Sequence, residues 1–208
     1  MATSGPAEHS ARSTFAPVDI ALVAVFAALI AVLSLLPAIP LAGGVPITLQ
    51  TLGVALAGLT LGPVRGFLAV LLYLLVGFAG LPVFAGGAAG LAVLGKPSAG
   101  YLLSFPIAAL LAGLLSRVLL RTRLPRYLAL FIAGFAASIL IVHPAGIGGL
   151  MVNANMALDK AVLTDLAFWP GDVIKNLLAA GLTLAVLKAF PDLFLGKQRR
   201  LGRDTVSR

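Results

Sequence analysis

Apolar residues gather in six long runs, and the segments between them are rich in proline, glycine and charge. A helix needs about 20 mostly apolar residues to cross the hydrocarbon core of a bilayer. The runs predict six membrane-spanning helices, at residues 18–36, 47–61, 66–81, 100–120, 127–146 and 171–190. The second and third are short, so we expect them to cross with little tilt, with local thinning of the bilayer or with a re-entrant start.

The composition agrees with this pattern. Of the 208 residues 60% are hydrophobic and 11% are charged, whereas a soluble domain carries about 25% charged residues. The mean hydropathy is +1.08, which also excludes an intrinsically disordered chain. The sequence therefore predicts an all-α integral membrane protein. We expect a polar N-terminal tail over residues 1–17, a membrane domain over 18–190 and a basic tail over 191–208.

Positive charge is distributed unevenly between the two sides of such a bundle. With six spans, the two termini and the second and fourth connections share one side, which holds 12 of the 15 lysines and arginines. Lys96, Lys160 and Lys175 lie on the other side. By the positive-inside rule both termini are cytoplasmic and the long connections face outward from the cell membrane. The net charge of +8 is thus a topology signal, and we expect no nucleic-acid partner.

Several kinds of chemistry are excluded by what the sequence lacks. It has no cysteine, and its two histidines, His9 and His143, form no cluster that could bind a metal. It contains no Walker loop for ATP hydrolysis and no Gly-x-Ser-x-Gly elbow for a serine hydrolase. We therefore expect no catalytic residue, metal or cofactor. The favoured interpretation is a binding protein, and a small membrane enzyme or a purely structural partner protein are the alternatives.

The strongest candidate for a binding site is the start of the last helix. Asp172 and Lys175 lie three residues apart and so share one helix face. Pro170 and Gly171 precede them, which places Asp172 near the N-cap, where its carboxylate could accept backbone N–H groups. The pair either grips a small polar solute or consists of a capping Asp and a snorkelling Lys. Trp169 beside them either stacks on a ligand or belongs to an interfacial aromatic belt.

Two further segments carry polar groups on the same predicted side. The segment 81–101 is rich in glycine, including Gly86 and Gly87, and such residues let the backbone approach a ligand closely. Within it, Lys96 is either an anchor for an anion or a loop lysine. At the start of the second helix Thr48, Gln50 and Thr51 follow one another closely, and the Gln50 amide must point inward to a ligand or to a neighbouring helix.

Other features point to packing rather than chemistry. We expect His143, followed by Pro144, to end the fifth helix with its ring hydrogen-bonded. The polar connection 147–170, which contains Asp165, is expected to form a solvated loop or a lid. On the first helix small residues follow one side at four-residue spacing, which favours close approach of another helix, either within this chain or from a partner. The candidate docking residues are Ala24, Ala27, Ala28 and Ala31.

These motifs in this order resemble a known family. The segments VPITLQTLGVALAG and LGPVRG (45–66), GLPVFAGG and GKPSAGYL (80–102) and WPGDVIKNLLA (169–179) are similar to the biotin-specific substrate-capture subunits of energy-coupling-factor transporters, the BioY family. Two departures stand out: the family's Gly-Pro-Ser/Thr-Gly-Gly-Tyr element reads Lys-Pro-Ser-Ala-Gly-Tyr over 96–101, and Ala88 occupies a position where some relatives have Asn.

The resemblance implies a six-helix protein that binds biotin in a pocket on the outer side. It implies that Asp172 accepts from a ureido N–H, that Lys175 donates to an oxygen, and that Tyr101 belongs to the pocket. Lys96 or a group of backbone amides would hold the biotin carboxylate. The implied partners are a transmembrane coupling subunit, docked on the alanine face of the first helix, and separate ATPases, or a second copy if the subunit works alone. A capture subunit for another vitamin is the alternative within this class.

Overall fold

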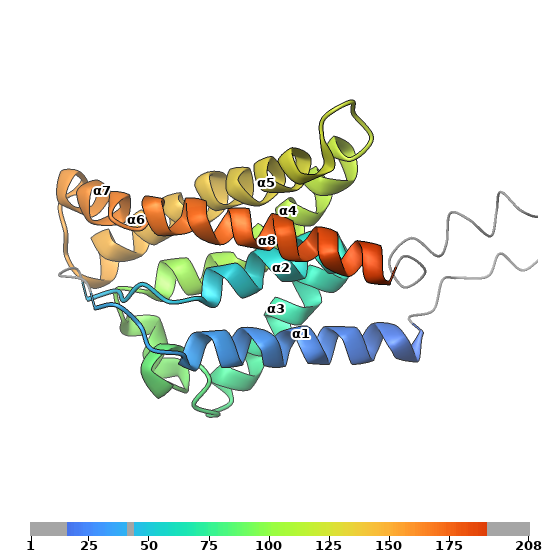
Figure 1. Ribbon diagram of the computed structural model, residues 1–208. Helices are drawn as coiled ribbons and strands as arrows, with labels where there is room; N and C mark the ends of the chain where they lie inside the picture. The colour runs from blue at the N-terminus through green and yellow to red at the C-terminus, as the bar shows by residue number, and fades with distance from the viewer. Residues whose placement is uncertain (1–15, 41–43, 191–208) are drawn as a thin grey trace, which may run out of the picture.

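The structure, a computed structural model, describes residues 16–40 and 44–190, and these residues form helices and two isolated β-bridges but no strand. Figure 1 shows the long helices roughly aligned along one bundle axis. The helices are α1 (Pro17–Leu35), α2 (Gln50–Leu61), α3 (Pro63–Phe78), α4 (Ala99–Leu119), α5 (Arg126–Ala137), α6 (His143–Asn153), α7 (Leu158–Leu166) and α8 (Trp169–Ala189), with short 3-10 turns η1 (Ala85–Gly87) and η2 (Leu91–Gly95) before α4 and a π-helical turn η3 (Ser138–Val142) after α5. The predicted tails lie outside the described residues, except that α1 already begins at Pro17.

The helix lengths match the predicted pattern. Four stretches are long and apolar enough to cross a bilayer: α1, α4, the continuous stretch Arg126–Asn153, and α8. α2 and α3 are shorter, with 12 and 16 residues. They are joined at Gly62, whose φ of +81° is a left-handed conformation that glycine adopts without strain. The all-helical membrane class is confirmed, and six spans remain the prediction.

The connections gather at the two ends of the bundle as the charge count requires. One end holds the start of α1, the α2–α3 turn, the α4–α5 connection and the end of α8 (Figure 1). There Arg65 Nη2 lies 2.7 Å from Asp19 Oδ1 and ties α3 to α1. The opposite end holds residues 36–40 and 44–49, the two 3-10 turns, and α6 and α7.

The fifth apolar run is longer than predicted. The expectation that His143 and Pro144 end this helix is wrong, because the helical stretch runs from Arg126 to Asn153 without a break. In the π-helical turn η3 the backbone widens, and the His143 N–H donates to the Ser138 carbonyl. A π-turn removes the clash between a proline ring and the carbonyl four residues earlier, so Pro144 begins α6 instead of ending the helix.

The expectation that segment 147–170 is a solvated loop is also wrong. It contains the end of α6 and all of α7, and the Asp165 residue is only 2% exposed. The sequence placed Asp165 among polar neighbours, but in α7 it lies one turn from Ala161, which is fully buried. α7 therefore turns the face that carries Ala161 and Asp165 toward the bundle, where other polar side chains contact Asp165.

Small residues bring α4 close to its neighbours. A methyl group added at Gly58 of α2 would collide with the Ala109 carbonyl of α4, and Gly100 of α4 lies against Gly149 of α6. Such contacts let helices approach closely in lipid, where van der Waals packing stabilises the bundle. α4 thus lies in the interior between α2, α3 and α6.

The alanine row of α1 divides between two faces. Ala27 is buried in the hydrophobic core and Ala31 packs against that core. Ala24 and Ala28 are exposed. The predicted docking surface therefore keeps two of its four alanines on the outside of this chain, and the other two serve intramolecular packing.

Candidate binding cavity

A cavity opens among α2, α4 and α8 at the end of the bundle that carries η1 and η2, and its empty space is about 680 Å³ when the part open to solvent is included. Three phenylalanines, Phe84, Phe105 and Phe168, form much of its apolar wall. Its polar lining residues are Thr48, Gln50, Thr51, Lys96, Ser98, Tyr101, Asp172 and Lys175. The combination suits a ligand with an apolar ring system and a few polar groups.

At the base of the wall Asp172 and Lys175 form a buried ion pair. Lys175 Nζ lies 2.9 Å from Asp172 Oδ1, and their side chains are 8% and 5% exposed. The Thr51 hydroxyl from α2 completes the group, at 3.0 Å from Lys175 Nζ and 3.2 Å from Asp172 Oδ1. The N-cap role predicted for Asp172 is wrong: α8 begins at Trp169, one turn of helix is already formed at Asp172, and the carboxylate bonds to side chains instead. An ion pair so enclosed is costly to bury. Ionisable groups buried within a membrane protein are therefore candidates for substrate recognition.

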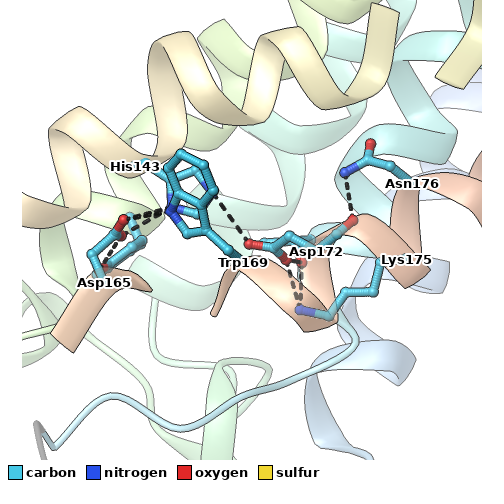
Figure 2. Close-up of polar contacts among 8 residues, drawn as sticks. His143, Asp165, Trp169, Asp172, Lys175 and Asn176 are labelled. Atoms are coloured by element: carbon cyan, nitrogen blue, oxygen red, sulfur yellow. Dashed lines mark hydrogen bonds and ion pairs between the residues drawn. The ribbon is translucent and has the colours of Figure 1, made fainter. Parts of the chain in front are cut away.

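A second carboxylate, Asp165, lies on the other side of His143 and Trp169 from this pair and accepts from three side chains (Figure 2). The Tyr101 hydroxyl donates to Oδ1 at 2.8 Å, and the Trp169 indole N–H donates to Oδ2 at 3.1 Å. His143 Nδ1 lies 3.0 Å from Oδ1 and 2.9 Å from Oδ2. The cluster joins α4, α6, α7 and α8, and so it fixes Tyr101 in the cavity wall.

His143 stands between the two carboxylates. Its Nε2 faces Asp172 Oδ2 at 3.5 Å, and this nitrogen is buried without a hydrogen-bond partner among the described residues. Asn176, one turn beyond Asp172, donates from Nδ2 to the Asp172 carbonyl at 2.8 Å. The expectation that the His143 ring is hydrogen-bonded is confirmed, and its partner is Asp165.

Gln50, which also lines the cavity, belongs to a separate polar group. Its Nε2 donates to the Tyr73 hydroxyl at 2.7 Å. That hydroxyl also contacts Ser34 Oγ at 3.2 Å and the Val83 carbonyl at 3.0 Å. One phenol therefore links α1, α2 and α3 to the segment that leads into η1. Gln50 points inward, as its polarity predicts, to both a neighbouring helix and the cavity.

The structure brings together six of the nine residues proposed for the ligand: Thr48, Gln50, Lys96, Tyr101, Asp172 and Lys175 line the cavity. Lys96 is exposed and so lies at the mouth. Gly86 and Gly87 lie in the exposed turn η1, whose neighbours Ala85 and Ala88 line the cavity instead. Trp169 is not among the lining residues because its indole N–H is bonded to Asp165 behind the wall.

Sequence reasoning gave no role to His143 and Asp165 in this cluster. Asp165, Trp169 and Asp172 are spaced four and three residues apart, a pattern that places side chains on one face if the chain is helical there. The signal was hidden because the segment looked like a polar loop. The pairing of His143 with both carboxylates depends on where α6 lies relative to α7 and α8 in the folded bundle, which spacing alone does not reveal.

Fold and cavity together define a multi-pass helical membrane protein with a mainly apolar cavity that carries a buried ion pair. A family model described as the BioY family matches residues 8–192. A biotin transporter BioY from Rhizobium etli is 42% identical over 177 residues, covering 83% of this chain and 95% of the relative. A biotin transporter BioY from Rhodobacter capsulatus is 39% identical over 188 residues, covering 86% and 98%.

A solved structure shares the fold. The crystal structure of the S-component for biotin from an ECF-type ABC transporter superposes with a TM-score of 0.78 at 29% identity, covering 84% of this chain and 95% of that chain. The chain belongs to the BioY family. The resemblance drawn from the motifs is confirmed, and the relatives are transporter components rather than enzymes.

Proposed function

We propose that this protein is the biotin-binding membrane subunit of a vitamin uptake transporter of the ECF type. The observation that carries the proposal is the buried Asp172–Lys175 pair on the wall of an otherwise apolar cavity. Buried charges within a membrane protein are expensive and mark substrate sites. The relatives are named as biotin transporters, and the solved S-component is one for biotin.

The chemistry of biotin fits the two ends of the cavity. Its ureido group has N–H donors and a carbonyl acceptor, which match the Asp172 carboxylate and the Lys175 ammonium. Its fused rings are apolar and suit the wall formed by Phe84, Phe105 and Phe168. Its carboxylate is negative, and Lys96 at the mouth is the matching cation. Thr48, Gln50 and Tyr101 supply additional hydrogen-bonding groups.

The proposed membrane arrangement follows from the charges. Among the described residues, Arg65, Arg117, Arg126 and Lys188 belong to the end of the bundle opposite the cavity. The positive-inside rule then places that end in the cytoplasm and the cavity on the outer side of the cell membrane. In this arrangement six helices span the bilayer, and α2 and α3 are its short members.

The proposed partners are a transmembrane coupling subunit and ATPase subunits. The chain has no Walker loop of its own, so energy must come from other proteins. Ala24 and Ala28 on the exposed face of α1 offer a small-residue surface for a helix of the coupling subunit. Self-association is the corresponding role for this surface if the subunit works alone.

Titration of the detergent-purified protein with biotin tests the function. We expect saturable binding with one site per chain and a rise in melting temperature as biotin is added. Thiamine and riboflavin serve as competitors of different shape, and neither should displace biotin. Binding of another vitamin in preference to biotin would move the protein to a different capture subunit. Absence of any stabilising small molecule would contradict the binding function itself.

A further inference from the structure

His143 is buried among charged groups and yet lacks a partner on one ring nitrogen. The residue is 3% exposed, and Nε2 has no hydrogen bond in the described part of the chain. It does not line the cavity but lies behind Asp172, which does. Its ring nitrogens face two carboxylates, Asp165 from α7 and Asp172 from α8. Each carboxylate has a further titratable partner, Tyr101 from α4 for Asp165 and Lys175 from α8 for Asp172.

The contacts of the ring fix one of its protons. Nδ1 lies within hydrogen-bond distance of both oxygens of Asp165. A carboxylate only accepts, so Nδ1 must carry a hydrogen. In a neutral imidazole Nε2 then carries a lone pair, and that lone pair would face Asp172 Oδ2 at 3.5 Å. Two acceptors that face each other in a buried site repel, whereas a second proton on Nε2 turns the contact into a charge-assisted hydrogen bond.

The charge of the cluster leads to the same conclusion. Asp165 and Asp172 contribute two negative charges and Lys175 contributes one positive charge, while the Tyr101 phenol is neutral as a donor to Asp165. With a neutral His143 the buried group keeps a net charge of −1. With a protonated His143 the net charge is zero, and uncompensated charge is costly in a site of low dielectric.

We propose that His143 is a positioning residue for the binding site: its doubly protonated ring holds Asp172 Oδ2 in place, and this form of the site binds the ligand best. Ligand binding then takes up one proton at pH values where the ligand-free ring has lost its second proton. The inference rests on the proposed function, because Asp172 is taken as an acceptor for biotin. Only the doubly protonated ring offers a donor to Asp172 Oδ2, so only this form of His143 can hold that oxygen in place for the ligand. By linkage, affinity must then fall as pH rises.

The test measures biotin affinity by calorimetry between about pH 5 and 8, the range in which imidazole changes its charge. Titrations in two buffers with different enthalpies of ionisation count the protons taken up. The variants are His143→Gln, which can hydrogen-bond but cannot become charged, and His9→Gln, which removes the other histidine of the sequence. Size-exclusion profiles and melting temperatures confirm that each variant is folded.

In the wild type and in His9→Gln we expect proton uptake and an affinity that falls by up to about tenfold per pH unit at the alkaline end. In His143→Gln the affinity at low pH should be about tenfold weaker and its pH dependence should disappear. A wild-type affinity that does not change with pH, or an unchanged pH profile in His143→Gln, overturns the proposal.

A measurement without ligand separates this inference from the proposed function. Nitrogen-15 NMR of labelled histidine reports the protonation of each ring nitrogen, and comparison with His143→Gln assigns the signal. We expect both nitrogens of His143 to be protonated at the acidic end of the range, whether or not biotin binds. A ring that stays singly protonated throughout overturns the inference, while failure of the wild type to bind biotin overturns the proposed function alone.

Discussion

The replacement Asp172→Asn removes the negative member of the buried pair while keeping its size. Lys175, whose side chain is 8% exposed, is then left with neutral acceptors such as the Thr51 hydroxyl at 3.0 Å. Breaking a buried ion pair from one side costs about 3–5 kcal/mol, because an uncompensated charge remains. We expect the free energy of unfolding to fall by about this amount. The double variant Asp172→Asn/Lys175→Met should recover most of it, since no unpaired charge is left.

Ligand affinity should behave differently from stability. Loss of a charged hydrogen-bond acceptor is worth about 1.5–3 kcal/mol, which corresponds to a roughly 10- to 150-fold weaker affinity for biotin. The double variant should regain stability but not affinity, because both recognition groups are gone. Thermal unfolding in detergent and calorimetric titration with biotin measure the two quantities. If the double variant is less stable than Asp172→Asn, the two residues do not act as a coupled pair. If Asp172→Asn binds biotin as tightly as the wild type, Asp172 is not a ligand acceptor.

Three further predictions address other parts of the molecule. Lys96→Gln should weaken the binding of biotin by about tenfold or less, because Lys96 is exposed at the mouth. The affinity for a neutral biotin ester should not change. Equal losses of affinity for both ligands would contradict the proposed contact between Lys96 and the biotin carboxylate. Gly146→Ala should place a methyl group on the Tyr101 ring and lower both affinity and melting temperature, with wild-type behaviour as the contrary result. Asp19→Asn breaks the ion pair with Arg65 at the end of the bundle opposite the cavity. It should lower the free energy of unfolding by up to about 1 kcal/mol and leave the affinity for biotin unchanged. This variant therefore also serves as a control for the cavity variants.

Much of the fold was predictable because the bilayer imposes simple rules. Long apolar runs gave helices whose ends lie near the observed ones, as at 100–120 against Ala99–Leu119. Proline and glycine marked the α2–α3 turn, and the charge count paired the connections that the structure places at one end. Pro144 misled the prediction because a π-helical turn, which has no sequence signature of its own, lets the helix continue past it.

The candidate site was predictable only where a charged or polar residue stood in an apolar stretch. Asp172 and Lys175 were evident for this reason, and so was Gln50. Asp165 was not, because a polar connection seldom forms a helix that faces the interior. For Trp169 the sequence left stacking on a ligand and a place in the interface open. Its hydrogen bond to Asp165, four residues earlier, was not foreseen because the segment between them was not expected to be helical.

The sequence by itself determined the class of molecule, because hydrophobicity and charge asymmetry act through the solvent and need no knowledge of which helices touch. Only the tertiary structure decided that His143 lies between two carboxylates and that Gln50 shares a phenol with Ser34. The first depends on how the side chain of His143 on α6 reaches α7 and α8, and the second on α1 packing beside α3. Helix packing of that kind depends on the shapes of many small contacts at once, whereas local sequence specifies only which side chains share a face.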